Sequence, residues 1–147
     1  MAALSEGCMN MLTVNLETAR RVIEAVETKA RSLDCPVNIA VVDAGGNLVA
    51  HARMDNARIG AIDIAINKAW TARALDTATD DLAKLTQSGQ QGFGLNTTNN
   101  SRVVIFGGGI PVKINGVVIG AIGASGGSVE EDIMVARAAV TGFVDEP

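Results

Sequence analysis

His51, Arg53 and Asp55 alternate along one short stretch, which places three polar side chains on one face of a predicted strand. The Arg53 guanidinium has a fork geometry that suits a carboxylate partner. Lys68 follows in an otherwise apolar helical stretch, where an unpaired charge is costly. One interpretation is an ion pair between Lys68 and either Asp55 or Asp63, bracing the junction of strand and helix. The other is a site where Arg53 and Lys68 bind an anionic small molecule.

The single histidine limits the catalytic chemistry that the chain can perform. His51 is a candidate metal ligand or general base, although such a residue is also common on surfaces and at interfaces. No serine or cysteine is visibly paired with a histidine base. Carboxylates such as Asp43, Asp55 and Asp63 could still act with Lys68 in proton transfer. We therefore favour a binding protein over an enzyme, and we keep a small-molecule enzyme and a structural subunit as alternatives.

The glycine-rich stretch "FGGGIPVKINGVVIGAIGASGGS" at residues 106–128 raises the question of phosphate binding. A phosphate loop leads into a helix, but the first cluster leads into a strand, because Asn115-Gly116 is a strong two-residue hairpin signal. The second cluster leads into a helix capped by Ser128 and Glu131. A dinucleotide fold would need a further parallel strand and the G-x-G-x-x-G spacing, and both are missing. We therefore exclude a phosphate loop and a dinucleotide site.

Backbone N–H groups in such turns can still hold a carboxylate. This applies to residues 125–128, where the chain enters the last predicted helix. The glycine-rich residues that we expect to contact a ligand are Gly108, Gly109, Ser125 and Gly126.

The periodicity of apolar residues predicts the order helix, two strands, helix, loop, three strands, helix. The first helix spans residues 16–33, begins at a cap on Thr13 or Asn15, and ends before Pro36. A Gly-Gly turn joins the first two strands, with Leu48, Ala50, Ala52 and Met54 expected on one face. A short helix is expected within 77–87, a polar loop at 88–101 and a strand at 103–106. This order fits an α/β fold, with a profilin-like antiparallel five-stranded sheet sandwiched by helices.

The composition bounds the class of protein. The 147 residues fit one domain spanning 1–147, with 48% hydrophobic residues. Only 3% of residues are aromatic and the net charge is −4, which argues against a nucleic-acid partner. We expect no signal peptide, no membrane helix and a cytoplasmic location. Cys8 and Cys35 lack metal-ligand spacing and are expected to be free thiols, with Cys35 buried.

Three segments together carry a resemblance to a known family. They are "VVDAGGNLVAHARMDNA", "IDIAINKAWTA" and "FGGGIPVKINGVVIGAIGASGGSVEEDIMVARA". In combination they resemble the GlcG family, which includes the PduO C-terminal domain and the HbpS haem-binding proteins. The resemblance covers residues 12–143. It implies a profilin-like fold and a homo-oligomer, often an octamer.

The resemblance also implies a function and a cofactor. Similar proteins occur beside glycolate, propanediol and glycerol pathways, and several bind haem or assist corrinoid chemistry. Haem-binding members use ligands that include a histidine on the N-terminal helix. Here that helix contains no histidine, so His51 is the only histidine ligand that the chain offers. The expected function is therefore that of a non-catalytic accessory protein that binds haem, a corrinoid-related molecule or another anionic small molecule.

The helix at residues 59–75 predicts self-association. It is apolar nearly all round, and a small domain has little room to enclose such a helix completely. We therefore expect a second copy of the chain to cover it in a homo-oligomer. Light scattering in dilute solution should give a mass that is a multiple of the chain mass, and a well-folded monomer would contradict the prediction.

Overall fold

Four helices and four strands form residues 13–143, the part of the chain that the computed structural model describes. The helices are α2 (Leu16–Ser32), α3 (Gly60–Ala74), α4 (Thr79–Leu85) and α5 (Val129–Arg137). The strands are β1 (Asn38–Asp43), β2 (Leu48–Arg53), β3 (Gly109–Ile114) and β4 (Val117–Ser125). Short 3-10 helices lie at η1 (Leu95–Thr97), η2 (Asn99–Ser101) and η3 (Ala138–Gly142). The strands form one antiparallel sheet in the order β2-β1-β4-β3.

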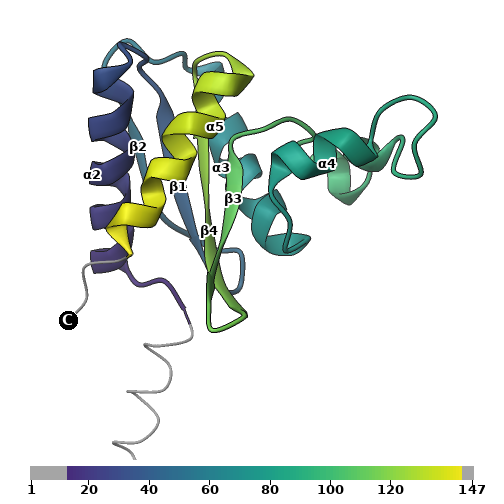
Figure 1. Cartoon of the computed structure of the whole chain (residues 1–147), viewed down its shortest axis with the longest axis horizontal. Helices are drawn as coiled ribbons and strands as arrows, with labels where there is room; N and C mark the ends of the chain where they lie inside the picture. Colours follow the sequence, from purple (N-terminus) through teal and green to yellow (C-terminus); the bar gives the residue numbers. More distant parts are fainter. Residues whose placement is uncertain (1–12, 144–147) are drawn as a thin grey trace, which may run out of the picture.

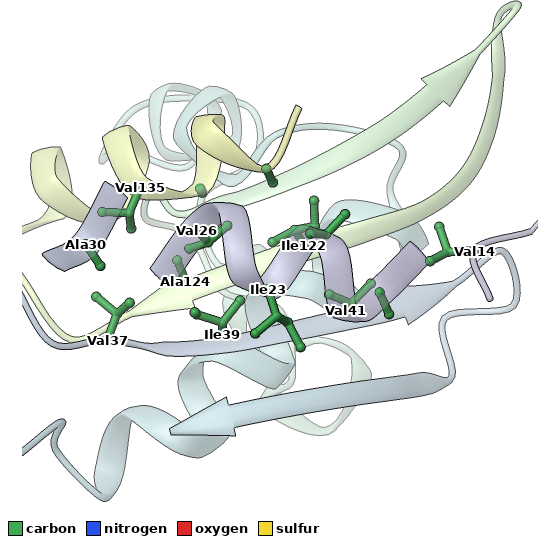
Figure 2. Close-up of a cluster of buried hydrophobic side chains, with 14 of the residues drawn as sticks. Val14, Ile23, Val26, Ala30, Val37, Ile39, Val41, Ile122, Ala124 and Val135 are labelled. Atoms are coloured by element: carbon green, nitrogen blue, oxygen red, sulfur yellow. The ribbon is translucent and has the colours of Figure 1, made fainter. Parts of the chain in front are cut away.

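The sheet lies between two layers of helix (Figure 1). Helices α2 and α5 cover one face, where Ile23, Val26 and Val135 join Ile39 and Val41 in the main core (Figure 2). Helix α3 covers the other face. Its sheet-facing side carries small residues, so a second and thinner core forms from alanines of α3 against β1 and β4.

Helix α3 comes very close to β4 because both elements present small groups. A Cβ atom added at Gly123 would overlap the Ala65 carbonyl oxygen and lie 2.7 Å from the Ala69 nitrogen. Glycine at this position is therefore required by the close approach of helix and sheet. This contact fixes the height of α3 above the sheet.

Several local predictions are confirmed. The Asn15 side chain caps α2, and Ser128 and Glu131 form the reciprocal capping box of α5. Asn115 and Gly116 both adopt positive φ in the turn between β3 and β4, as a tight hairpin requires. Cys35 is a buried free thiol, whereas Cys8 lies outside the described residues.

The predicted strand at residues 103–106 is wrong, and the described sheet has four strands. The segment is not paired with a neighbouring strand. Instead, the Val104 backbone N–H donates to Thr71 Oγ1 at 3.0 Å, so a side chain of α3 takes the donor that a ladder would use. The mixed α/β class holds, and the profilin-like classification stays a prediction.

The predicted facing of β2 is wrong at its first residue. The pairing of β1 with β2 shifts between Val41, opposite Ala50, and Val42, opposite Leu48, so a bulge interrupts the alternation. Leu48 therefore lies on the α3 face, away from Ala50 and Ala52. Met54 packs against the main core, as its apolar neighbours predicted.

The outer part of α3 keeps apolar side chains at the surface of the chain. Ile59 is 77% exposed and Leu75 39%. Ile62, Ile66 and Trp70 are half-buried. No helix of residues 13–143 combines the length and apolar character needed to cross a membrane. The coverage of this surface by a second copy of the chain stays a prediction.

The close approach at Gly123 gives a stability prediction. Gly123→Ala should lower the free energy of unfolding by about 2–3 kcal/mol, because the methyl group overpacks the contact between α3 and β4. Gly60→Ala is the matched control, since a Cβ there meets nothing within 4 Å. Urea denaturation should show a lower midpoint for the first variant alone. Equal midpoints would contradict the assigned packing.

Candidate functional site

Lys68 is the most deeply buried charge of the described chain. Its side chain is 0% exposed. Its Nζ atom donates to Asp132 Oδ2 and to the Ala124 carbonyl oxygen, each at 2.9 Å. The Phe106 ring covers the ammonium, with its centroid 5.1 Å from Nζ. The positive charge is therefore satisfied by one carboxylate, one carbonyl and an aromatic face.

The ion pair joins elements from the two helical layers. Lys68 belongs to α3, whereas Asp132 lies on α5, whose apolar side packs into the core on the opposite face of the sheet. The lysine side chain crosses the sheet at the point where β3 begins to pair with β4. There the Ala124 N–H donates to the Gly108 carbonyl, and the Ala124 carbonyl accepts from Lys68 Nζ. A Cβ atom at Gly108 would lie 2.7 Å from Nζ. Glycine is needed here to leave space for the lysine.

Burial shifts the acid–base properties of both partners. Removal from water lowers the pKa of Lys68 and raises the pKa of Asp132, and the hydrogen bond between them opposes both shifts. The Gly127 backbone N–H also donates to Asp132 Oδ1 at 2.9 Å. Asp132 is therefore held on two sides, by the lysine and by the glycine-rich turn.

The predicted partner of Lys68 is wrong. Asp63 accepts a hydrogen bond from Asn67, and Asp55 lies exposed after the end of β2. The pairing with Asp132 joins residues 64 positions apart in the chain. No local spacing could indicate it, although Asp132 lies in the first turn of α5, shortly after the glycine-rich turn.

The glycine-rich turns bind groups of the chain itself. Gly127 N–H donates to Asp132, and Ser128 N–H donates to Glu131 Oε1 at 3.0 Å. In the first cluster, Gly109 N–H donates to Thr79 Oγ1 at 2.8 Å. The carboxylate expected at residues 125–128 is thus supplied internally by α5.

A second group of polar residues lies at the free edge of the sheet, on β2. His51 and Arg53 pair with Ala40 and Asn38 of β1, so both lie on the α3 face. His51 Nε2 is buried and has no hydrogen-bond partner among the described residues. Burial lowers the pKa of His51 below its usual 6.5. The imidazole is therefore neutral near pH 7 and keeps an unused ring nitrogen.

Apolar residues of α3 face this edge. Ile62 and Ile66 lie on one side of the helix, and Arg73 lies on the same side, seven residues after Ile66. Arg73 Nε donates to the Ala44 carbonyl in the turn between β1 and β2, so this side faces β2. Leu48 is 49% exposed on the same face. We name this group the β2–α3 edge; it comprises Leu48, His51, Arg53, Ile59, Ile62 and Ile66.

Arg53 lies at one end of a polar row across three strands. Asn38 pairs with Arg53 on one side and with Ser125 on the other. Asn38 Nδ2 donates to the Arg58 carbonyl at 3.0 Å, while its buried Oδ1 has no partner among residues 13–143. Arg53 is exposed and donates to the Ala57 carbonyl. Sequence reasoning missed Asn38, which reads as one polar residue at the start of a buried strand.

Cys35 is a poor metal ligand in this setting. Burial, together with the nearby Glu131 carboxylate, raises the pKa of its thiol to about 11, so the thiol stays protonated. No group of three His, Cys, Asp or Glu side chains within 13–143 is placed to hold a metal ion.

Comparison with known proteins identifies relatives over nearly the whole chain. The family described as "Haem degrading protein HbpS-like" matches residues 14–141. A 15.0 kDa protein of the dhaT-dhaS intergenic region of Citrobacter freundii is 46% identical, over 89% of this chain and 92% of that protein. The corrinoid adenosyltransferase PduO of Salmonella typhimurium is 36% identical over 88% of this chain, which spans only 38% of that enzyme.

A solved structure supports the same assignment. The crystal structure of a PduOC:heme complex superimposes with a TM-score of 0.84 at 36% identity, covering 88% of this chain and 94% of that one. The resemblance predicted from the three sequence segments is confirmed.

The buried ion pair predicts a large and partner-dependent loss of stability. Lys68→Met should lower the free energy of unfolding by about 3–5 kcal/mol, because it leaves Asp132 buried without its cation. The double variant Lys68→Met/Asp132→Leu should recover part of that loss. Lys84→Met, at an exposed ion pair on α4, is the control and should change stability by less than about 1 kcal/mol. Additive losses in the double variant would argue against coupling.

Proposed function

Because this chain belongs to the HbpS-like family of haem degrading proteins, we propose that it binds haem or a related tetrapyrrole as a non-catalytic accessory protein. The observation that carries the proposal is the unpartnered, neutral imidazole nitrogen of His51 at the β2–α3 edge. A buried nitrogen without a hydrogen bond is costly for a fold, and iron ligation is a use for such a group. Haem would supply an iron atom, and His51 is the residue that would ligate it.

The residues of the β2–α3 edge fit such a group chemically. Ile59 and Leu48 offer exposed apolar surface for a flat ring. Arg53 offers a guanidinium for a propionate carboxylate, and Arg58 is a second exposed cation close by. His51 Nε2 is enclosed in the free chain, so iron reaches it only after a covering side chain moves.

The histidine that we propose as the iron ligand lies on a different element from the histidine that the resemblance implies. Helix α2 carries no histidine between Leu16 and Ser32, whereas the expected ligand lies on the N-terminal helix. His51 comes from the edge strand β2 instead. We propose that the chain keeps a haem-related role with a different axial residue.

The alternative of an acid–base enzyme is less well supported than the binding role. Lys68 is enclosed and bound to Asp132, and Asp55 does not pair with it. We further propose service in a diol, glycerol or glycolate pathway and assembly as a homo-oligomer, an octamer in the form that the resemblance implies. A second subunit against the β2–α3 edge would enclose a ring bound there.

Haemin titration followed by visible absorption tests the proposal. The full chain should give a saturable, shifted Soret band. His51→Ala should weaken binding by about tenfold or more and move the band, because the axial ligand is lost. Arg53→Ala should weaken binding without moving the band. Arg20→Ala, an exposed arginine on α2, is the matched control and should change neither.

Two results would contradict haem ligation by His51. No saturable band would remove the haem proposal and favour a structural accessory role. A band unchanged in His51→Ala but weakened in Arg53→Ala would replace iron ligation with propionate-led binding.

The pH dependence gives an independent check. A protonated imidazole cannot ligate iron, and the folded pKa of His51 lies below 6.5. Affinity that depends on His51 should therefore persist as the pH falls to 6.5 and should be lost only at lower pH. Loss with a midpoint above 6.5 would assign the titrating group elsewhere.

A further inference from the structure

A polar pocket lies on the β3 side of α3, away from the β2–α3 edge. Its volume is about 370 Å³, which is within the range of small-molecule sites. Helix α3 contributes Asp63, Ile64 and Asn67, and the loop of η1 and η2 contributes Asn96, Thr97 and Ser101. Residues 103–106 complete the wall and end at Phe106, the ring that covers Lys68.

Successive hydrogen bonds link the polar side chains in and beside this pocket. Arg102 Nε donates to Asn67 Oδ1 at 3.3 Å, and Asn67 Nδ2 donates to Asp63 Oδ2 at 3.0 Å. The Arg102 guanidinium stacks on Trp70 at 4.3 Å. This chain of contacts fixes the Asp63 carboxylate and leaves Oδ1 without a partner among the described residues. The Asn96 amide also has no hydrogen-bond partner within residues 13–143.

The loop backbone is held in an unusual shape at the pocket. Asn99, Asn100 and Ser101 have φ values of 52°, 56° and 60°, three consecutive non-glycine residues in the left-handed region. Such runs are rare because each residue is disfavoured there. The run turns the chain back toward α3, where Ser101 joins the lining.

We propose that this pocket binds a small neutral polyol. Asp63 is the one charged residue of the lining. The Arg102 guanidinium beside the pocket is bonded to Asn67 and stacked on Trp70, so an anion entering the pocket would be repelled by Asp63. A metal ion is disfavoured, because no group of three His, Cys, Asp or Glu side chains within residues 13–143 is placed to hold one. Hydroxyl groups can donate to Asp63 and exchange hydrogen bonds with Asn96. The carbon skeleton can contact Ile64 and Phe106.

The proposed polyol site is independent of the haem proposal. None of its lining residues belongs to the β2–α3 edge, and His51 lies on the opposite side of α3. Failure of one proposal therefore leaves the other intact, and the variants that test them differ.

Glycerol is the probe for the first experiment, with amide chemical shifts of the isotope-labelled full chain as the readout. Saturable shifts should appear at residues 94–106 and in α3 near Asp63. 1-Propanol has the same three carbons but one hydroxyl, so it should bind more weakly. Glycerate has the same skeleton with a carboxylate and should also bind more weakly than glycerol, because of Asp63.

Asp63→Asn is the deciding variant, because it keeps the side-chain shape and removes the charge. It should raise the glycerol dissociation constant by about five- to tenfold. Glu130→Gln, an exposed carboxylate change on α5, is the matched control and should leave the constant unchanged. Circular dichroism checks that both variants stay folded. Unsaturable shifts, glycerate binding as tight as glycerol binding, or an unaltered constant in Asp63→Asn would overturn the proposal.

Discussion

The buried ion pair of Lys68 and Asp132 is the constraint on which the architecture depends. A lysine enclosed by protein needs a carboxylate, and here the carboxylate comes from the helix layer on the other side of the sheet. That requirement explains the glycine at 108, which leaves space for the side chain. It also explains why the turn before α5 donates to Asp132. The "GGG" and "SGGS" stretches, which resemble ligand-binding loops, are shaped around this internal contact.

Helix α3 carries small residues on the side that packs against the sheet and larger residues elsewhere. Alanines and Gly123 bring the helix close to the sheet, so the larger isoleucines are displaced to its flanks and outer side. On the β2 side they meet an edge strand that carries His51 and Arg53. On the β3 side Ile64 adjoins Asp63 and Asn67. One helix thus presents an apolar edge with an imidazole and, opposite it, a polar pocket.

Local signals in the sequence predicted most of the elements correctly. The amphipathic stripe of α2, the Asn115-Gly116 hairpin and the Ser128 capping box each depend on a few neighbouring residues, and each is present. The failures concern longer-range geometry. A strand at 103–106 was expected from β-branched residues, yet Thr71 on α3 takes a ladder donor there. The bulge that turns Leu48 to the α3 face cannot be recognised from the alternation of apolar and polar residues in the sequence.

The candidate sites also divide into features with local sequence signals and features that depend on longer-range contacts. The strand alternation did place His51 and Arg53 on one face, and Lys68 was identified as a buried charge that needs a partner. The partner itself, 64 residues later, could not be predicted from spacing, because the fold alone brings α3 and α5 together. The polar pocket was also invisible, since its lining combines a helix with a loop that curls back through Asn99 and Asn100.

The distance along the chain between Lys68 and Asp132 also bears on how the protein is made. During synthesis from the amino terminus, α3 is complete long before α5 leaves the ribosome. Until then Lys68 has no carboxylate from α5, and burying its ammonium without one is costly. Helix α3 therefore cannot settle fully onto the sheet in a partial chain. Because α5 supplies Asp132 and part of the main core, we expect a fragment that ends before α5 to be much less stable than the whole domain.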